Sequence, residues 1–502
     1  MKGPGLLLGV GFALVLATAA IGTPADADLW GHLTFGRDMV AAGQIVQAEP
    51  YAFTSDRPWV NHEWLTEVSF AEVYRLAGTS GLVLVKLLII AALLTLVWRY
   101  VRPLRPSAKV TVALLTLVFI GTYWRTHTIR PQLFSVLFFA IVVMAMARAD
   151  QGRRRGLLLV PPLMALWVNF HGGWIVGLGV LGMWTAVRVV DWRIPLRERL
   201  ALATVGLTAV AATLINPYGV HMWSFLGETV RLGRADIQEW APVLSRPLAL
   251  GLPWVMTLAV AGLARWRAGR PQRWDYLAIA ALLAFASFRV SRLDAFFTLV
   301  VVILLAPEVV TLLGSLDRPK VAAGAGKGPA KAAQETGLIV ITVVTVAAML
   351  VPAARIIGPY ATCLTFDGAW VPEPEAGRFI QANRLKGRML TWFDWGQYAI
   401  WHFGPDLQVS MDGRRETVYT DATLQAHLRL YDADDTAFSY LRTLNPDYIW
   451  LPKRLKVTET LETAGWTAVF DGPVSTVFAP DGTGPFQQVN TETPSRRCFP
   501  GP

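Results

Sequence analysis

Residues 82–101 read LVLVKLLIIAALLTLVWRYV, an apolar run that contains one charged residue, Lys86, before Arg99 near its end. An α-helix rises 1.5 Å per residue, so about 20 apolar residues cross the roughly 30 Å hydrocarbon core of a bilayer. The run therefore predicts a membrane-spanning helix, and it determines the fold class because similar runs recur along the chain.

The chain has 502 residues, of which 53% are hydrophobic and only 16% are charged. Soluble domains have a charged share of about 25%, so the composition favours a membrane protein. The apolar runs begin near Leu6, Leu82, Val110, Leu133, Leu157, Ile175, Ala201, Leu248, Tyr276, Ala295 and Leu338. They predict an α-helical polytopic membrane protein with about eleven transmembrane helices. The first run also fits a cleavable signal peptide, and we favour its retention as a helix.

Lysine and arginine gather in alternate loops, and such an excess marks the cytoplasmic side. The clusters are Arg99–Lys109, Arg148–Arg155, Arg188–Arg199, Arg265–Arg273 and Arg318–Lys331. The opposite loops are poorer in basic residues, and in residues 23–79 acidic side chains outnumber arginines. We therefore expect a cytoplasmic (inner) membrane protein with its N-terminus inside and its C-terminus in the periplasm or outside the cell. The +10 net charge then reflects topology and not nucleic-acid binding.

The predicted organisation has two parts. Residues 1–357 form a transmembrane domain with a large first outer loop, 23–79. An Ala/Gly/Lys-rich segment, 316–336, is typical of a flexible cytoplasmic linker between the last two spans. Residues 358–502 have a mixed composition and predict a soluble α/β domain outside the cytoplasm.

Short strand-like segments in the C-terminal part, such as GRMLTWF, DLQVSMD and PDYIWLP, alternate with a helical stretch, TLQAHLRLYDADDTAFSYLRTL. The polar residues at the ends of these strands are Asp394, Asp412, Arg414 and Arg415. Structural turn roles are favoured for each of them over acceptor binding. Cys363 and Cys498 bracket the domain, and in an oxidising compartment a disulfide between them would join its ends.

All seven histidines fall on the predicted outer side, together with other polar residues at helix ends. The candidate ligand-binding residues are His32, His62, Arg125, His127, Arg130, Asn169, His171, Asn216, Glu239, Arg289, Arg292 and Asp294. Taken singly, each fits an interfacial or capping residue, since polar groups at helix ends cost little where water reaches them. Taken together, they predict an outer cavity in which four arginines bind a lipid-linked phosphate or pyrophosphate, because guanidinium groups suit phosphate.

The first outer loop carries the candidate catalytic carboxylates, Asp26 and Asp28, in the segment ADADLW. An amphipathic helix is predicted to begin near Asp28, so one of the two aspartates is a candidate helix cap. A carboxylate beside a phosphate pocket also suits a base for an acceptor hydroxyl. His62-Glu63 does not continue as a zinc-protease motif, because Thr66 stands where the second histidine belongs.

The chain resembles the GT-C superfamily of polytopic glycosyltransferases, which use polyprenyl-phosphate sugars outside the cytoplasmic membrane. The resemblance is carried by the acidic first loop, the many spans and the outer terminal domain. The motifs are DADLWGHLTFGRDM, PWVNHEWLTEV, RTHTIRPQLFS, WVNFHGGWIVGL, INPYG, IQEW, FDWGQYAIWHF and VSMDGRRETVY, which look like a group of bacterial membrane proteins of that general type.

The resemblance implies that Asp28 is the catalytic base, with Asp26 as its neighbour and Glu63 or Glu239 as a second carboxylate. It also implies that the segment from Arg125 to Arg130 holds the lipid phosphate. Because Ala27 separates two aspartates where an Asp-Glu pair is common, the metal requirement is open. No cofactor is certain from the sequence, and a divalent metal ion is the candidate.

The leading hypothesis is a glycosyltransferase that moves a hexose or pentose from a polyprenyl-phosphate donor to an envelope glycan, lipid or protein. The expected partners are membrane lipid, the lipid-linked sugar and the acceptor, with no nucleic acid. One alternative is a transporter or assembly factor that binds a lipid-linked glycan without catalysis. Another is a membrane acyltransferase that uses Asn169 and His171, with His171 as base.

Overall fold

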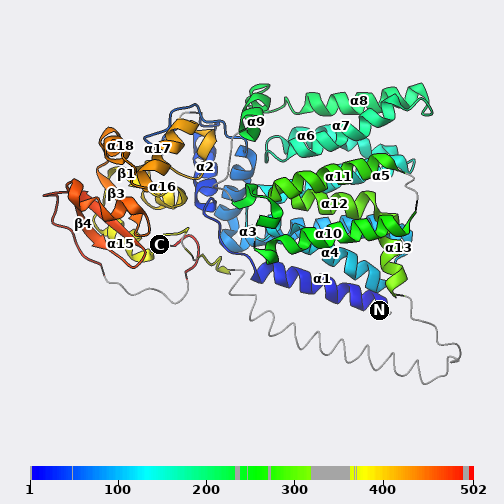
Figure 1. Cartoon of the computed structure of the whole chain (residues 1–502), viewed down its shortest axis with the longest axis horizontal. Helices are drawn as coiled ribbons and strands as arrows, with labels where there is room; N and C mark the ends of the chain where they lie inside the picture. Colours follow the sequence, from blue (N-terminus) through cyan, green and yellow to red (C-terminus); the bar gives the residue numbers. More distant parts are fainter. Residues whose placement is uncertain are drawn as a thin grey trace, which may run out of the picture. The chain divides into compact units, whose positions relative to one another are not determined.

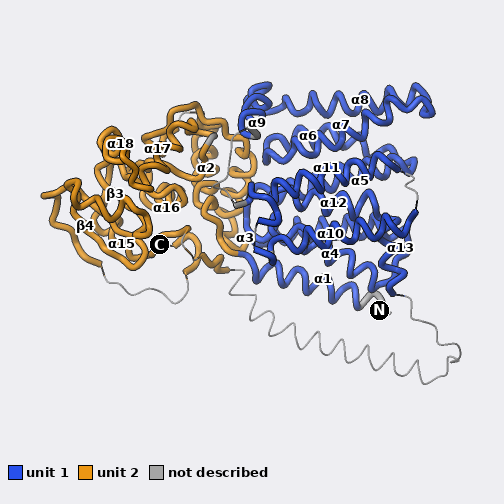
Figure 2. The backbone as a smooth tube through the Cα atoms, in the orientation of Figure 1, with its two compact units in different colours: residues 1–23, 83–361 blue, residues 24–82, 362–502 orange. Residues whose placement is uncertain are grey.

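The computed structural model describes residues 3–47, 49–231, 238–245, 247–269, 273–317, 362–366, 368, 370–489 and 497–501. The apolar run from Leu338 and the predicted domain boundary at 357/358 lie outside these residues, as does all but the start of the predicted linker 316–336. Two compact units make up the chain, and neither is continuous in sequence (Figure 2). Unit 1 comprises 1–23 and 83–361, and unit 2 comprises 24–82 and 362–502.

Unit 1 is a bundle of helices (Figure 1). Its described α-helices are α1 (Gly3–Ile21), the second part of α3 (Trp64–Val101), α4 (Ala108–Thr126), α5 (Gln132–Asp150), α6 (Val160–Trp167), α7 (Trp174–Val190), α8 (Leu196–Ala212), α9 (His221–Arg231), α10 (Leu248–Arg267), α11 (Trp274–Arg289), α12 (Asp294–Leu304) and α13 (Ala306–Asp317). Helix α12 is the centre of the bundle, since it packs against α4, α5, α10 and α11 and every one of its side chains is buried.

Helices occupy the positions of the ten predicted apolar runs that fall on described residues. Three helical segments there, Trp64–Leu104, Ala108–Thr126 and Gln132–Asp150, are long and apolar enough to cross a membrane. The pair formed by Ser291–Leu304 and Ala306–Asp317 passes the same test together but bends by 80°. The chain is therefore a membrane protein by its apolar helices, while the count of eleven spans stays a prediction.

Lys86, the charged residue inside the first quoted run, has a structural role. Its side chain is fully buried. The Nζ atom donates to the Ala19 carbonyl at 3.0 Å, to the Thr23 hydroxyl at 2.6 Å and to the His127 carbonyl at 2.5 Å. These three acceptors match the three N–H groups of an ammonium, so Lys86 links the ends of α1 and α4 to α3.

A cluster of ion pairs lies at the C-terminal end of α5. Arg188 Nη2 lies 2.6 Å from Asp150 Oδ2 and 2.8 Å from Asp275 Oδ2. Arg273 Nη2 lies 2.7 Å from the same Asp150 oxygen, and Tyr276 also donates to it. Two guanidinium groups therefore face two carboxylates, and their ion pairs connect α5, α7 and the start of α11.

Unit 2 joins the first loop to an α/β domain, so residues far apart in sequence form one body. Its elements are α2 (Leu29–Ala42), the first part of α3, α15 (Pro374–Ala382), β1 (Gly387–Thr391), α16 (Gly396–Phe403), β2 (Leu407–Val409), α17 (Asp421–Tyr431), α18 (Ala437–Leu444), β3 (Tyr448–Pro452), β4 (Trp466–Asp471) and β5 (Ser475–Pro480). The predicted strands are confirmed. The predicted single helical stretch forms two helices, α17 and α18, separated by Asp432–Thr436.

The sheet of unit 2 is mixed, with strand order β2-β1-β3-β5-β4. Strand β1 pairs in parallel with β2 and β3, whereas β5 pairs antiparallel with β3 and β4. Helix α16 connects β1 to β2 and packs against α2 of the first loop. The carboxyl ends of β1 and β2 therefore meet at one edge of the sheet, where ligands commonly bind in α/β folds.

Two kinds of contact hold the first loop to the α/β domain. Ala52 bridges to Val409 of β2, and Trp30 of α2 packs its ring against Phe366, Tyr398 and Phe499.

The predicted disulfide between Cys363 and Cys498 is present, with a Cα–Cα distance of 4.9 Å. Helix α3 contains Gly78 at φ 58°, ψ −152°, so its regular helical geometry is interrupted there.

Candidate functional site

The predicted site residues form two groups, one in each unit. The first group centres on Arg125, at the end of α4, whose side chain is only 3% exposed. Its Nη1 atom lies 3.1 Å from Glu239 Oε1, and its Nε atom lies 3.4 Å from Asp294 Oδ1 at the start of α12. Three segments distant in sequence therefore meet around one buried guanidinium group.

Two further arginines face the same Glu239 carboxylate. Arg130 Nη1 lies 3.5 Å from Oε1, and Arg292 Nε lies 4.0 Å from Oε2. Among the described residues, three guanidinium groups thus face the two carboxylates of Glu239 and Asp294. Neither Nη atom of Arg125 has a well-aligned hydrogen-bond acceptor among the described residues, so this buried arginine retains donor capacity for an anion.

His171 lies against the same group, and its neighbours determine its tautomer. The Gly173 N–H donates to His171 Nδ1 at 3.0 Å, and the Ser135 hydroxyl lies 2.7 Å from the same atom. Because Nδ1 accepts, the proton of the neutral ring is on Nε2. His171 Nε2 lies 3.5 Å from Arg292 Nη2, so the two groups are near enough to contact one phosphate oxygen together.

Ser135 is a member of this group that sequence reasoning missed. It is buried in α5, where its hydroxyl also accepts from Trp167 Nε1 at 2.7 Å. The motif RTHTIRPQLFS ends on this serine, so its place in the motif was the available signal.

Four other predicted residues of unit 1 take no part in these ion pairs. Asn169 Nδ2 donates to the Ala165 and Ile215 carbonyls, both at 2.8 Å, and Asn216 supports the turn before α9 through Thr213 and Tyr218. The ring of His127 stacks on Tyr123 with 5.6 Å between the ring centroids. Arg289 is exposed at the end of α11.

The second group contains the candidate base, Asp28, at the start of α2. Asp28 is the N-cap residue by position, yet its side chain makes no capping hydrogen bond. Asp26 Oδ1 instead accepts from the Asp28 N–H at 3.1 Å. Asp26 therefore supports the turn, whereas the Asp28 carboxylate is not used as a cap.

His32 and Glu63, both predicted site residues, belong to local pairs. His32 Nδ1 lies 3.2 Å from Glu67 Oε1, and Asn61 donates to the other oxygen of Glu67 at 2.5 Å. Burial alone lowers the pKa of His32, but the hydrogen bond and charge of Glu67 outweigh burial and raise that pKa to about 8. His62 Nε2 lies 3.4 Å from Glu63 Oε1, so the predicted second carboxylate already has a basic neighbour.

The Asp28 carboxylate lies against Gly413 and Gln397 of the α/β domain, which the sequence analysis did not name singly. A methyl group at Gly413, in the turn after β2, would overlap with Asp28 Oδ1 and lie 3.1 Å from Gln397 Nε2. Asp394, which follows β1, is close enough to respond to the same aspartates. Burial chiefly, with the charges of Asp28 and Asp26, raises the pKa of Asp394 to about 6.

A divalent metal was the candidate cofactor, and we tested whether the residues fit one. Within the described ranges, no group of three or more His, Cys, Asp or Glu side chains is arranged to hold a metal ion. The divalent metal therefore stays a prediction from the sequence, and no step below is routed through one.

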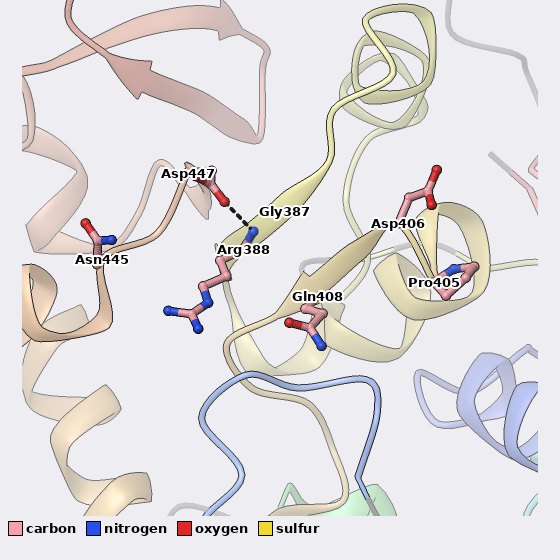
Figure 3. Close-up of a pocket in the computed structure, with 7 residues that line it drawn as sticks. All are labelled: Gly387, Arg388, Pro405, Asp406, Gln408, Asn445 and Asp447. Atoms are coloured by element: carbon pink, nitrogen blue, oxygen red, sulfur yellow. Dashed lines mark hydrogen bonds between the residues drawn. The ribbon is translucent and has the colours of Figure 1, made fainter.

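A polar cavity of about 390 Å³ lies at the opposite, amino edge of the same sheet (Figure 3). It is lined by Gly387, Arg388, Pro405, Asp406, Gln408, Asn445 and Asp447. Asp447 Oδ2 accepts from the Arg388 backbone N–H at 2.7 Å, as Figure 3 shows. None of the predicted site residues lines this cavity, so it supplies positions for control variants.

No protein-family model matches the chain, and no curated protein matches it in sequence. Among solved structures, it is similar to the oligosaccharyltransferase of Archaeoglobus fulgidus in the apo form, with a TM-score of 0.55 and 11% identity over 89% of this chain and 69% of the other. It is also similar to ArnT from Cupriavidus metallidurans bound to undecaprenyl phosphate, with a TM-score of 0.52 and 15% identity over 96% and 98% of the two chains. Both are GT-C superfamily members, and the predicted resemblance is confirmed at the level of the fold: the chain has a GT-C-like fold.

Proposed function

We propose that this protein is a membrane glycosyltransferase that moves a sugar from a polyprenyl-phosphate donor to an acceptor hydroxyl of the cell envelope. The observation that carries the proposal is the Arg125 group, in which three arginines converge on Glu239 and His171 Nε2 lies 3.5 Å from Arg292 Nη2. A phosphate monoester or diester is the class of ligand that such a cluster of guanidinium donors suits. The GT-C-like fold, shared with an ArnT bound to undecaprenyl phosphate, supports the same lipid class.

In the proposed reaction, the Asp28 carboxylate takes the proton of the acceptor hydroxyl. The acceptor oxygen bonds to the anomeric carbon, and the bond from that carbon to the phosphate oxygen breaks with its electron pair on the leaving polyprenyl phosphate. In unit 1, Arg292, Arg130 and His171 bind the phosphate of the lipid carrier. Arg125, held by Glu239 and Asp294, donates to the same phosphate.

The proposal includes the topology that the loop charges predict. The first loop and the α/β domain lie outside the cytoplasmic membrane, about eleven spans cross it, and the arginine-rich loops lie inside. The acceptor is then an envelope glycan, lipid or protein, since such molecules are available on that side.

The test uses purified full-length protein in detergent, radiolabelled polyprenyl-phosphate sugars and cell-envelope acceptors. Asp28→Asn should lower transfer by about 10²- to 10⁴-fold, because it removes the base and preserves the shape of the side chain. Asp406→Asn, an exposed carboxylate of the amino-edge cavity, is the matched control and should retain wild-type transfer.

The outcomes separate the candidate functions. Transfer that survives Asp28→Asn removes Asp28 from the role of base. Retention of radiolabelled lipid by the protein, with no transfer from any donor, favours a lipid-linked glycan carrier over an enzyme.

A further inference from the structure

The carboxyl edge of the parallel strands in unit 2 is where the α/β domain meets Asp28. Asp394 and Gln397 follow the end of β1 at Thr391. Asp412 and Gly413 follow the end of β2 at Val409, and β2 pairs in parallel with β1. Crevices at this edge are the usual ligand sites of α/β folds, because consecutive loops diverge there. In unit 2 the start of α2 lies in that position, since α2 packs on α16.

Close approach at two glycines shows how tightly Asp28 is held. At Gly413, a Cβ atom would overlap with Asp28 Oδ1, with Gln397 Nε2 only 3.1 Å away. At Gly31, in the first turn of α2, a Cβ atom would overlap with the carboxamide oxygen of Gln397, whose Cγ would lie 2.9 Å away. Gln397 is 3% exposed, so it has little freedom to move aside. The carboxylate and the carboxamide thus converge on one glycine.

We propose that Gly413 and Gln397 are positioning residues that hold the Asp28 carboxylate at the carboxyl edge of the sheet. The catalytic meaning of this placement rests on the proposed function, in which Asp28 is the base. The α/β domain then supplies the immediate surroundings of the base. Gly413 acts by having no side chain, because any Cβ atom would displace Oδ1 of Asp28.

The first experiment is a double-mutant cycle on thermal unfolding of the full-length protein in detergent. Gly413→Ala should lower the melting temperature by about 3 to 8 °C, because an inserted methyl group must displace its neighbours. In the Asp28→Ala background the same substitution should have a much smaller effect, since the overlapping carboxylate is gone and only the contact with Gln397 Nε2 at 3.1 Å remains.

Gly472→Ala is the matched control, because its methyl group would overlap with the carboxylate of another residue, Glu373, in the same unit. Its effect on the melting temperature should be the same with and without Asp28. A loss from Gly413→Ala that persists undiminished in the Asp28→Ala background overturns the proposal.

The second experiment measures kcat against pH with the lipid-linked sugar and the acceptor. Gln397→Glu, which is nearly isosteric, should move the acidic limb of the profile to higher pH, because a second carboxylate disfavours the ionised base. Gly413→Ala should lower kcat at least about tenfold and leave the KM of the lipid donor unchanged. The control Gly472→Ala should change neither the acidic limb of the profile nor the KM. If Gln397 had only a structural role, Gln397→Glu would also leave the acidic limb in place.

The two experiments fail separately. If wild-type protein transfers no sugar, the proposed function is lost, and the unfolding cycle still decides whether Gly413 positions Asp28. If transfer is present but the acidic limb does not move in Gln397→Glu, the positioning role of Gln397 is wrong and the transferase stands.

Discussion

The guanidinium group of Arg414, after β2, donates to the carboxylate of Glu49, 365 residues earlier in the first loop, with 2.9 Å between Nη2 and Oε1. The same Nη2 lies 2.6 Å from Asp412 Oδ2, and the guanidinium lies over the rings of Phe35 and Trp59 at 4.7 and 4.9 Å. A buried cation is therefore paired twice and covered by aromatic rings.

Arg414→Met should lower the free energy of unfolding of the full-length protein by about 3–5 kcal/mol, because it leaves the buried Glu49 and Asp412 carboxylates without their counter-ion. Chemical denaturation followed by tryptophan fluorescence measures this. The control is Lys386→Met, which breaks an exposed pair with Asp406 and should cost less than about 1 kcal/mol. Equal losses from the two variants would contradict a special role for Arg414.

The disulfide closes a long segment, since Cys363 and Cys498 are 135 residues apart in sequence. In the chain-entropy account, a loop of this length restricts the unfolded chain by about 4–5 kcal/mol. Replacing both cysteines by serine should reduce the stability of the protein by an amount of that order, and reductant should have the same effect on the wild type. Peptide mapping without reductant identifies the bond, and a wild-type melting temperature insensitive to reductant would argue against it.

His32 should make stability depend on pH. Its pKa in the folded protein, about 8, lies above the ordinary value of 6.5, so the folded state holds the proton more tightly. The stabilisation, about 2 kcal/mol for this difference, is complete below pH 6.5 and is lost as the pH rises through 8. Melting curves between pH 6 and 9 should show this decline in the wild type and a weaker decline in His32→Gln. Parallel curves would show that Glu67 does not hold the proton on His32.

Arg292 should contribute directly to binding of the lipid phosphate. Its side chain is partly exposed beside Glu239 and His171, so removing it should spare the fold. Arg292→Ala should weaken binding of a polyprenyl phosphate by about 10- to 100-fold, the range of a hydrogen bond to a charged group. Titration of the detergent-solubilised protein measures the change. Arg193→Ala, an exposed arginine of the α7–α8 loop, controls for net charge, and an equal loss there would point to non-specific attraction.

Local patterns predicted the elements of the structure well. Short segments rich in β-branched and aromatic residues predicted the five strands of unit 2. The apolar runs predicted the positions of the helices of unit 1. The number of spans did not follow, because several apolar helices, such as Trp174–Val190, are shorter than a bilayer requires.

Contacts between distant segments set the limit of sequence reasoning at the site. The meeting of Arg125, Glu239 and Asp294 was expected from topology, since loops on one side of a membrane lie near one another. The approach of Gly413 to Asp28 was not, because it depends on the packing of α2 against the α/β domain. His32 was predicted to bind a ligand, but in the structure it pairs with the buried Glu67. This pair forms only when α2 and α3 pack together, so the sequence did not indicate it.

The discontinuity of unit 2 bears on how the protein is made. Residues 24–82 leave the ribosome before residues 83–361, and their partner surface, 362–502, is synthesised last. Through most of translation the partners of Trp30 and Glu49 in the first loop have therefore not yet been synthesised. The proposed base reaches Gly413 only when the last part of the polypeptide has been made.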